Sequence, residues 1–337
     1  MKMLVCTAPG HFTFREDALP EAGAGMARIR LKRVGICGTD LHAFEGTQPF
    51  FSYPRILGHE LSGELIDAGG ADGFEPGELV TIIPYFSCGN CIACRTGKPN
   101  CCVNINVFGV HIDGGMREEI VVPANSLLHG QGLNADELAL VEPLAIGAHG
   151  VRRANVQAGE FVLVIGAGPI GLGTMELARI AGARVIALDI NADRLRFCQE
   201  HLGVHAAVNG TDNDAIEQVK AITNGDFPTV VIDATGNLRA INSGIQYLAH
   251  GGRYVLIGLQ KEAFSFSHPE FHKRESTLMS SRNAVKEDFE QVIRSMKKGA
   301  IRPQTYITHT VAFDEVPAQF ESWLNPATGV IKAMVHF

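Results

Sequence analysis

FVLVIGAGPIGLGTMELARIAGARVIALD, residues 161–189, decides the fold of this 337-residue chain. It begins with a short apolar run, turns through GAGPIG, continues with helical spacing, and returns through RVIAL to an aspartate. This order predicts a strand, a tight turn, a helix and a second strand that ends at an acidic residue. Further along, NADRLRFCQEHLG, TVVIDATG and GGRYVLIGL continue the alternation of helix and strand. We therefore expect an α/β domain with a doubly wound parallel sheet.

The turn GAGPIG has the glycine spacing of a dinucleotide-binding loop. Gly166 permits a sharp turn, Gly168 lets the backbone approach a pyrophosphate, and Gly171 lets the helix pack close to the strand. The pyrophosphate then binds unpaired N–H groups at the helix start, beside Pro169 and Ile170. Glycine turns also join strands to helices for packing alone, but here the strand, the helix and the acidic residue all agree with a nucleotide site.

Asp189 closes this unit at the end of the second strand. A carboxylate there can accept both ribose hydroxyls of NAD and would repel the additional phosphate of NADP. Arg194 is placed to lie over the adenine or near the ribose, although a solvated helix arginine fits the same position. The ends of two later strands should face the same crevice. The predicted NAD-binding residues are Gly166, Gly168, Pro169, Ile170, Gly171, Asp189, Arg194, Thr235, Ile257 and Gly258.

Composition limits the classes of protein to which the chain can belong. Its length favours two domains, and 46% apolar with 19% charged residues is enough to bury a sizeable core. A net charge of −7 gives no electrostatic reason to bind nucleic acid or an anionic membrane. The N-terminus, MKMLVCTAPGHF, lacks the apolar core of a signal peptide. We expect a soluble, cytoplasmic protein with a small-molecule substrate.

Five of the eight cysteines lie in SCGNCIACRTGKPNCC, and four of them have metal-ligand spacing. Their spacing, C-x2-C-x2-C-x7-C, can close a tetrahedral sulfur cage around one zinc ion. The alternative, four unconnected buried thiols, does not account for that spacing. Cys101 is another candidate for the last ligand, but the spacing favours its neighbour. Because the cage has no open position, we expect a structural zinc in a lobe over 86–104. Its predicted ligands are Cys88, Cys91, Cys94 and Cys102.

The N-terminal part reads as β-rich, because MKMLVCTA and MARIRLKRVGIC alternate as strands do. It contains two short motifs with side chains that could bind a metal or take part in catalysis. GICGTDLH holds Cys37, Thr39 and His42, and LGHE holds His59 and Glu60. A lone cysteine or histidine is usually a buried or satisfied structural residue. A thiolate and an imidazole, each beside a carboxylate and glycines, are together typical of an open catalytic zinc site.

Such a site needs a further ligand from elsewhere in the chain. Glu142, in ELALVEPLAIGAHGVRRANV, stands directly before Pro143, which is placed as the first residue of a helix reaching Ala154. A carboxylate there can cap the helix through its dipole or can supply the missing metal ligand. The local sequence leaves both interpretations open.

The order GICGTD, GHE, four-cysteine lobe, EP, GAGPIG and acid resembles the zinc-dependent medium-chain dehydrogenase/reductase superfamily over essentially the whole chain. The resemblance implies a GroES-like catalytic domain over 1–148 and 282–337 and an NAD-binding Rossmann domain over 149–281. Glu142 stands where liver-type alcohol dehydrogenases carry a cysteine ligand, so the chain is similar to the polyol and sugar-acid branch. GVHIDGG, and SSRNAV followed by ITHT, resemble the RspB-like L-galactonate/L-gulonate 5-dehydrogenases within it.

The resemblance also implies roles for the site residues. A catalytic zinc would be held by Cys37 and His59, and Asp40 would orient the histidine. Glu60 and Glu142 would supply or exchange the remaining positions. Zinc is a Lewis acid that lowers the pKa of a bound alcohol, whose carbon can then release hydride to NAD.

Thr39 and His42 match the family's proton relay, in which the hydroxyl accepts the alcohol's proton and the imidazole passes it to water. We thus expect an NAD-dependent oxidation of a secondary alcohol of a sugar acid, specifically the C5 hydroxyl of L-gulonate or L-galactonate. Arg117 or Arg282 could bind the substrate carboxylate bidentately, although both could equally be salt-bridge residues.

Three alternative functions are compatible with the same metal- and NAD-binding residues. A sorbitol-type polyol dehydrogenase would need no carboxylate pocket, and an L-threonine 3-dehydrogenase is compatible with Glu142. A regulatory protein that binds NAD and zinc without turnover belongs to another class, but it has no need of a proton relay. The family resemblance further implies a homodimer or homotetramer joined through the edge of the cofactor sheet.

Overall fold

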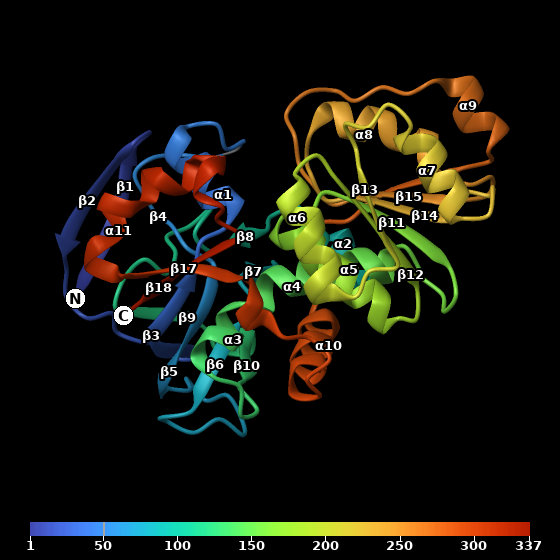
Figure 1. The fold of residues 1–337 in the computed structure, drawn as a ribbon. Helices are drawn as coiled ribbons and strands as arrows, with labels where there is room; N and C mark the ends of the chain where they lie inside the picture. The colour runs from blue at the N-terminus through green and yellow to red at the C-terminus, as the bar shows by residue number, and fades with distance from the viewer. Residues whose placement is uncertain (50) are drawn as a thin grey trace. The chain divides into compact units, whose positions relative to one another are not determined.

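The computed structural model describes residues 1–49 and 51–337 of the chain. Their contacts divide the chain into two compact units. The first unit comprises Met1–Pro143 and Val285–Phe337, and the second comprises Leu144–Ala284. Both chain ends belong to the first unit, as the marks N and C in Figure 1 indicate. The described residues contain no helix with the length and apolar character needed to cross a bilayer.

The first unit is built mainly of strands, as the alternating N-terminal segments predict. Its strands are β1 (Lys2–Ala8), β2 (His11–Glu16), β3 (Met26–Gly35), β4 (Arg55–Ile56), β5 (Glu60–Asp67), β6 (Leu79–Ile82), β7 (Tyr85–Phe86), β8 (Asn106–Val107), β9 (Glu119–Pro123), β10 (Leu127–His129), β17 (Ile307–Ala312) and β18 (Lys332–His336). Its helices are α1 (Gly38–Glu45), α2 (Ile92–Arg95), α3 (Ala135–Ala139), α10 (Lys286–Lys297) and α11 (Val316–Gln319). Helix α4 (Val141–Arg153) runs from this unit into the second.

Short 3₁₀ turns join these elements at Pro99–Cys101, Ala124–Ser126, Pro303–Tyr306, Phe313–Glu315, Phe320–Leu324 and Pro326–Thr328. The main sheet of the unit has the strand order β10-β6-β5-β3-β18-β17, and β9 also pairs with β3. β2, β1 and β4 form a smaller sheet, and β7 pairs with β8. β18, from the C-terminal end of the chain, lies antiparallel to β3 from the N-terminal part. The last segment of the chain therefore completes the sheet that the first segment begins.

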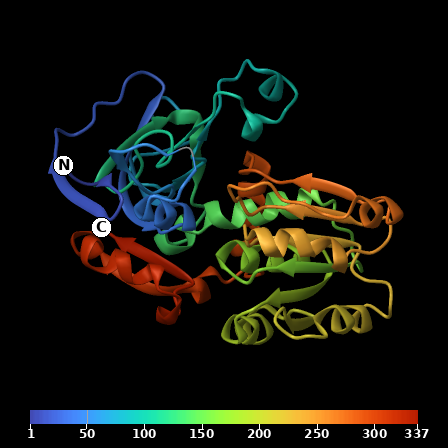
Figure 2. The ribbon, with the colours of Figure 1, turned by 90° about the horizontal axis from the view of Figure 1, so that it is seen from above.

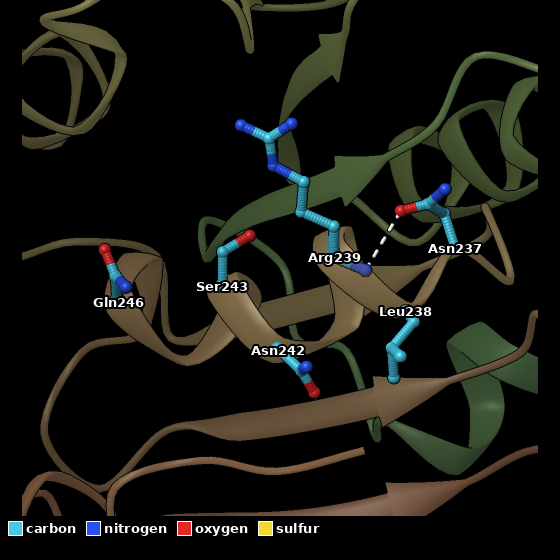
Figure 3. Close-up of a pocket in the computed structure, with 6 residues that line it drawn as sticks. All are labelled: Asn237, Leu238, Arg239, Asn242, Ser243 and Gln246. Carbon is cyan, nitrogen blue, oxygen red and sulfur yellow. Dashed lines mark hydrogen bonds between the residues drawn. The ribbon is translucent and has the colours of Figure 1, made fainter. Parts of the chain in front are cut away.

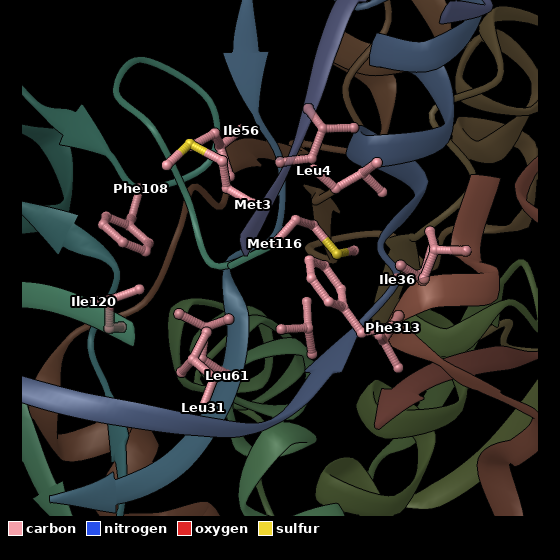
Figure 4. Packing of buried hydrophobic residues seen from close by; sticks show 14 of the residues in the cluster. Met3, Leu4, Leu31, Ile36, Ile56, Leu61, Phe108, Met116, Ile120 and Phe313 are labelled. Carbon is pink, nitrogen blue, oxygen red and sulfur yellow. The ribbon is translucent and has the colours of Figure 1, made fainter. Parts of the chain in front are cut away.

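The core of the first unit lies where its sheets meet (Figure 4). Met3, Leu31 and Leu61 come from three different strands, and Phe108 and Phe313 come from the turns after β8 and β17. All five side chains are buried. The burial of this apolar surface holds the strands that carry the site residues in fixed positions.

The second unit contains a parallel sheet with the strand order β13-β12-β11-β14-β15-β16, within residues 144–284, all of which are described. Its strands are β11 (Phe161–Ile165), β12 (Arg184–Asp189), β13 (Ala206–Asn209), β14 (Val230–Asp233), β15 (Arg253–Leu256) and β16 (Thr277–Ser280). Its helices are α5 (Pro169–Ile180), α6 (Ala192–Phe197), α7 (Ala215–Ile222), α8 (Leu238–Gly244) and α9 (His268–Lys273), with a π-helical turn at Cys198–Leu202 and a 3₁₀ turn at Ile245–Tyr247.

Successive residues of the central strands β11 and β14 are buried, so both faces of this sheet are covered. Figure 1 shows these strands, in green to orange, with α7 and α8 along them. The predicted fold class, a doubly wound parallel sheet plus a β-rich unit, is confirmed.

Some local predictions differ from the structure. Strand β2 lies between the two predicted N-terminal strands and was not foreseen. Helix α4 begins at Val141, so the prediction that Pro143 is the first helical residue is wrong. Proline fits anywhere in the first turn, because the N–H groups there have no partner within the helix. β14 ends at Asp233 and β15 at Leu256, so the predicted nucleotide contacts that follow them lie in turns.

Candidate functional site

Asp40 joins the two sequence motifs of the first unit. Cys37 directly precedes α1, and its N–H donates to Asp40 Oδ2 at 2.9 Å. Asp40 Oδ1 accepts from the N–H of Gly58 at 3.1 Å, and Gly58 directly precedes His59. Gly58 has φ +93°, a conformation that favours glycine. The buried Asp40 carboxylate therefore sets the start of α1 beside the loop that carries His59.

Cys37, His59 and Glu60 form a cluster with the composition of a zinc site. Their ligand atoms, a thiol sulfur, a ring nitrogen and a carboxylate oxygen, all lie within 4.8 Å of one another. His59 and Glu60 are buried. His59 Nδ1 is buried with no hydrogen-bond partner among the described residues, and it lies 3.9 Å from Asp40 Oδ1, beyond hydrogen-bond distance. A thiol, an imidazole and a carboxylate this close together are the donor types that a zinc ion accepts.

Negative charge concentrates on this cluster. Burial lowers the pKa of His59, but the charges of Asp40, Cys37 and Glu142 outweigh burial and hold that pKa well above its usual value. A buried site with this much negative charge favours a cation, and a bound divalent metal would satisfy it.

Glu142, a predicted ligand in the first turn of α4, lies outside this group of three, although its charge acts on His59 and Glu60. Tyr85 Oη donates a hydrogen bond to Glu142 Oε1, and both groups are buried. Burial raises the pKa of Glu142 to about 7, and the charge of Glu60 acts in the same direction, whereas the charge of His59 opposes it. Glu142 therefore both hydrogen-bonds to Tyr85 and interacts electrostatically with His59 and Glu60. Tyr85 was missed from the sequence, because nothing local marks it.

Lys332 is a second residue that sequence reasoning missed. Its Nζ lies 2.6 Å from Oε1 and 2.6 Å from Oε2 of Glu60, and 3.0 Å from the carbonyl oxygen of Ile36. Lys332 is 2% exposed and Glu60 is fully buried. Burial lowers the pKa of Lys332, but the adjacent Glu60 carboxylate outweighs burial and raises it. A lysine almost never lies this deep without a paired charge, and only the pairing of distant strands reveals this one.

Thr39 and His42 lie on α1, three positions apart and so on one side of the helix. Thr39 is half-buried and His42 is exposed. A threonine nearer the protein interior and a histidine nearer the solvent are arranged in the order that a proton relay requires. Their role remains a prediction.

The four-cysteine group forms a second candidate metal centre, in the teal segment that projects from the first unit in Figure 2. Cys88, Cys91, Cys94 and Cys102 bring their sulfur atoms within 4.8 Å of one another. Backbone N–H groups of Cys94 and Val103 lower the pKa of Cys91 to about 6. The thiolate form of Cys91 is therefore favoured, whereas burial and the neighbouring Cys91 raise the pKa of Cys94 to about 11.

Cys101 lies outside this group and is exposed. The backbone N–H groups of Cys88 and Asn104 both donate to Cys102 Sγ, each at 3.3 Å. The structure thus selects Cys102 over its neighbour as the fourth sulfur. The chain holds a four-cysteine structural zinc site and a separate cysteine, histidine and glutamate catalytic zinc site.

In the second unit, the glycine turn closes between β11 and α5. Gly166 has φ +100°, and its N–H donates to the Leu188 carbonyl at 2.7 Å. A Cβ on Gly171 would overlap the carbonyl oxygen of Gly166, whereas a Cβ on Gly168 would meet nothing within 4 Å. Gly168 also has an ordinary φ of −78°. Neither packing nor backbone conformation requires a glycine there, which fits a bound group that approaches the backbone.

Asp189 supports the same turn from the end of β12. Its Oδ2 accepts from the N–H of Ala167 at 2.5 Å, and its Oδ1 accepts from the N–H of Asn191 at 2.8 Å. Helix α5 has no side-chain cap and starts with Pro169 and Ile170, so its first N–H groups are open to an anion. Arg194 follows in α6, half-buried. These features fit the pyrophosphate and ribose of a dinucleotide.

The turns after β14 and β15 pack against each other through glycine. A Cβ on Gly258, which follows Ile257, would overlap the backbone nitrogen of Gly236. The buried Asp233 carboxylate fixes the first turn, because it accepts from the N–H groups of Thr235 and Gly236, both at 3.1 Å. Asp233 was not among the predicted site residues, although its place at a strand end is a usable signal.

A pocket of about 540 Å³ follows the surface of α8 in the second unit (Figure 3). Asn237 caps the helix by accepting from the Arg239 N–H at 3.0 Å, and Asn242 and Gln246 line the pocket further along. Cys37 and His59 belong to the other unit, so this pocket does not contain the candidate catalytic cluster.

The two arginines proposed for a substrate carboxylate lie in different units. Arg117 Nη2 donates to the Asp113 carbonyl at 3.4 Å, and its guanidinium lies over the Phe108 ring. Burial lowers its pKa. Arg282 is exposed in the second unit. Their role as carboxylate ligands remains a prediction.

Comparison with known proteins identifies the family of the chain. Residues 169–298 match the model of the zinc-binding dehydrogenases, and residues 23–131 match that of the alcohol dehydrogenase GroES-like domain. The chain is 42% identical to L-galactonate-5-dehydrogenase of Escherichia coli (strain K12), over 100% of this chain and 99% of that protein. It is 35% identical to the starvation-sensing protein RspB of the same strain, over 94% and 93% of the two chains.

The fold is likewise similar to a solved structure. The rspB alcohol dehydrogenase from E. coli CFT073, complexed with the cofactor NADH, superposes with a TM-score of 0.92 at 31% identity, over 100% of this chain and 99% of that one. The resemblance inferred from the motifs is confirmed. The chain belongs to the zinc-binding dehydrogenases, with a GroES-like domain of the alcohol dehydrogenase type and a parallel-sheet coenzyme domain.

Proposed function

We propose that this protein oxidises the C5 secondary hydroxyl of L-galactonate or L-gulonate to a ketone, with NAD as hydride acceptor. The observation that carries the proposal is the cluster of the half-buried Cys37 with the buried His59 and Glu60, on which the charge of Glu142 also acts. Full-length similarity to an L-galactonate-5-dehydrogenase supports the sugar-acid class of substrate.

In this proposal, Cys37 and His59 hold the catalytic zinc, and Glu60 and Glu142 are the exchangeable carboxylates. A zinc ion held by these residues would supply Lewis-acid chemistry that favours loss of the hydroxyl proton. Thr39 takes that proton, and His42, exposed on the same side of α1, passes it to water. Asp40 holds the cysteine and histidine motifs in register for this step.

The second unit binds NAD in the same proposal. The pyrophosphate lies at the start of α5, where Gly168 leaves room, and Asp189 accepts the ribose hydroxyls. The carboxylate has lone pairs for both ribose hydroxyls in addition to its two backbone contacts. Thr235, Ile257 and Gly258 lie in the turns that would face the nicotinamide half. The catalytic role thus belongs to the first unit and cofactor binding to the second.

Formation of NADH at 340 nm by the zinc-loaded protein tests the proposal, with L-galactonate, L-gulonate, sorbitol, xylitol and L-threonine as substrates. Turnover on either sugar acid that clearly exceeds turnover on sorbitol supports it. Preference for sorbitol or xylitol would assign the protein to the polyol dehydrogenases, and preference for L-threonine to the 3-dehydrogenases. NAD binding with no turnover on any substrate would favour a regulatory protein that binds NAD and zinc without catalysis.

Recognition of the substrate carboxylate is assigned to Arg117 or Arg282. Arg117→Gln and Arg282→Gln separate the two, because the residue that binds the carboxylate should raise the KM for the sugar acid and leave that for sorbitol unchanged. If neither variant changes the KM ratio, another group binds the carboxylate.

We also propose a homodimer or homotetramer that works in the cytoplasm. Strand β16 ends the parallel sheet in the order of paired strands, which leaves an edge available to a second copy. A reducing compartment would keep the eight cysteines out of disulfides, so that those of the two clusters remain available to a metal. Sedimentation of the zinc-loaded protein measures the number of subunits.

A further inference from the structure

Glu60 and Lys332 meet across β3, the strand that lies between β5 and β18 in the main sheet. Gly35 on β3 is paired with Glu60 on one side and with Met334 on the other. A Cβ at Gly35 would overlap Glu60 Oε2, so the glycine leaves the space in which the Glu60 carboxylate lies. Gly35 also begins the GICGTD motif, so the same segment supplies Cys37 and makes room for this ion pair.

The Lys332 ammonium contacts both carboxylate oxygens of Glu60. The two distances of 2.6 Å, and the third contact to the Ile36 carbonyl at 3.0 Å, leave all three ammonium donors directed at buried oxygens. The lysine is therefore fixed in position by its own contacts. It does not compete with Cys37 or His59, because it has no acceptor atom with which to bind a metal when charged.

An ammonium on a carboxylate changes what that carboxylate can do for a metal ion. Glu60 retains lone pairs that can bind the metal beside Cys37 and His59. The lysine draws negative charge away from those lone pairs and also repels a divalent cation a short distance away. Both effects weaken the bond between Glu60 and the metal.

Glu142 differs in this respect. Its partner is the neutral hydroxyl of Tyr85, which contacts one carboxylate oxygen. The two carboxylates at the site are therefore unequal: Glu60 is in direct contact with an ammonium group, whereas Glu142 hydrogen-bonds to a neutral hydroxyl and interacts with the charges of His59 and Lys332 only electrostatically. Such partners outside the ligand shell commonly tune metal sites.

We propose that Lys332 is a positioning residue that keeps Glu60 a weak, displaceable metal ligand, so that a substrate oxygen can take its place. This inference rests on the proposed function, since it assumes a metal at Cys37 and His59. Its distinguishing consequence is that loss of Lys332 makes the catalytic metal harder to remove. A lysine that merely supported the structure would have the opposite effect, because its loss would leave Glu60 out of place.

The rate of zinc transfer to the chromogenic chelator 4-(2-pyridylazo)resorcinol tests this in the full-length, zinc-loaded protein. The two zinc centres should release in separate phases, and Cys37→Ser identifies the catalytic phase as the one it removes. Lys332→Met should slow that phase by about tenfold, the scale of effects outside the ligand shell. Lys332→Arg, which restores the charge, should release zinc at nearly the wild-type rate.

Glu60→Gln provides the matched background. Once the carboxylate is gone, adding Lys332→Met should no longer slow release, because no anionic oxygen remains to bind more tightly. If Lys332→Met does not fold, Lys332→Gln makes the same comparison, since its amide can still donate one hydrogen bond but carries no charge.

Release of the catalytic zinc from Lys332→Met, or from Lys332→Gln in its place, at an unchanged or faster rate would overturn the inference. If Cys37→Ser removes no phase from the release curve, the metal site itself is misassigned, and the proposed function fails instead.

Discussion

A Cβ on Gly171 would overlap the carbonyl oxygen of Gly166, whereas one on Gly168, between them in the same turn, would meet nothing within 4 Å. Gly171 is required by the packing of the fold, because α5 starts close against the turn. Gly168 is not required by packing. Its place at the open start of the helix suits the close approach of a bound group.

Substitution by alanine should therefore affect stability at Gly171 and NAD binding at Gly168. Gly171→Ala should lower the free energy of unfolding by about 1–3 kcal/mol through overpacking. Gly168→Ala should leave the free energy of unfolding within about 1 kcal/mol of wild type and weaken NAD binding about tenfold or more. Denaturant titration and NADH fluorescence measure the two effects. If Gly168→Ala binds NAD as tightly as the wild type, the pyrophosphate does not bind at this turn.

Asp189 should decide the choice between NAD and NADP. Asp189→Asn keeps an oxygen that can accept from the N–H of Ala167 or of Asn191, but it removes the charge that repels the 2′-phosphate. We expect the ratio of kcat/KM for NAD to that for NADP to fall about tenfold, or about 1.4 kcal/mol. Steady-state kinetics with both cofactors provides the measurement. An unchanged ratio would mean that another residue selects the cofactor.

The two metal centres should be separable by single cysteine substitutions. Wild-type protein should contain about two zinc ions per chain. Cys37→Ser should retain about one, lose turnover and keep its fold, because the structural cage is intact. Cys94→Ser should also retain about one, held at the catalytic site.

Cys101→Ser is the matched control for Cys94→Ser, because its thiol is exposed and lies outside the group of four. It should keep the full zinc content by elemental analysis. Loss of a zinc ion from this variant would show that Cys101, rather than Cys102, completes the cage.

Glu142 predicts a pH dependence in the metal-free protein. Burial raises its pKa from 4.5 to about 7, so the folded protein binds this proton more tightly than the unfolded chain does. The metal-free protein should therefore lose stability as the pH rises from about 4.5 to about 7. A metal binds only the ionised carboxylate, so zinc affinity should increase over the same range.

Thermal denaturation of zinc-loaded and chelator-treated protein should show a gap in Tm that widens as the pH rises through this range. Glu142→Gln retains the contributions of His59 and Cys37 to that trend but loses its own, so its gap should widen less. Equal trends in the two proteins would show that Glu142 does not face the metal.

Much of this protein could be predicted from local sequence. GAGPIG and the runs around it specify a strand, turn and helix, because glycine positions and apolar periodicity act over a few residues. The spacing of Cys88, Cys91, Cys94 and Cys102 likewise predicts a metal cage, since one loop holds all four sulfurs. The start of α4 was predicted two residues too late, at Pro143 instead of Val141, because proline fits more than one position in a first turn.

Only the tertiary structure showed how distant residues meet at the catalytic cluster. Lys332 and Glu60 are 272 positions apart and become neighbours because β18 and β5 both pair with β3. Tyr85 reaches Glu142 across 57 positions. Neither contact leaves a periodic or spaced signal in the chain, since each depends on strand pairing and core packing. The sequence alone determined the kinds of ligand present, and the fold decided which charge or hydroxyl lies against each carboxylate.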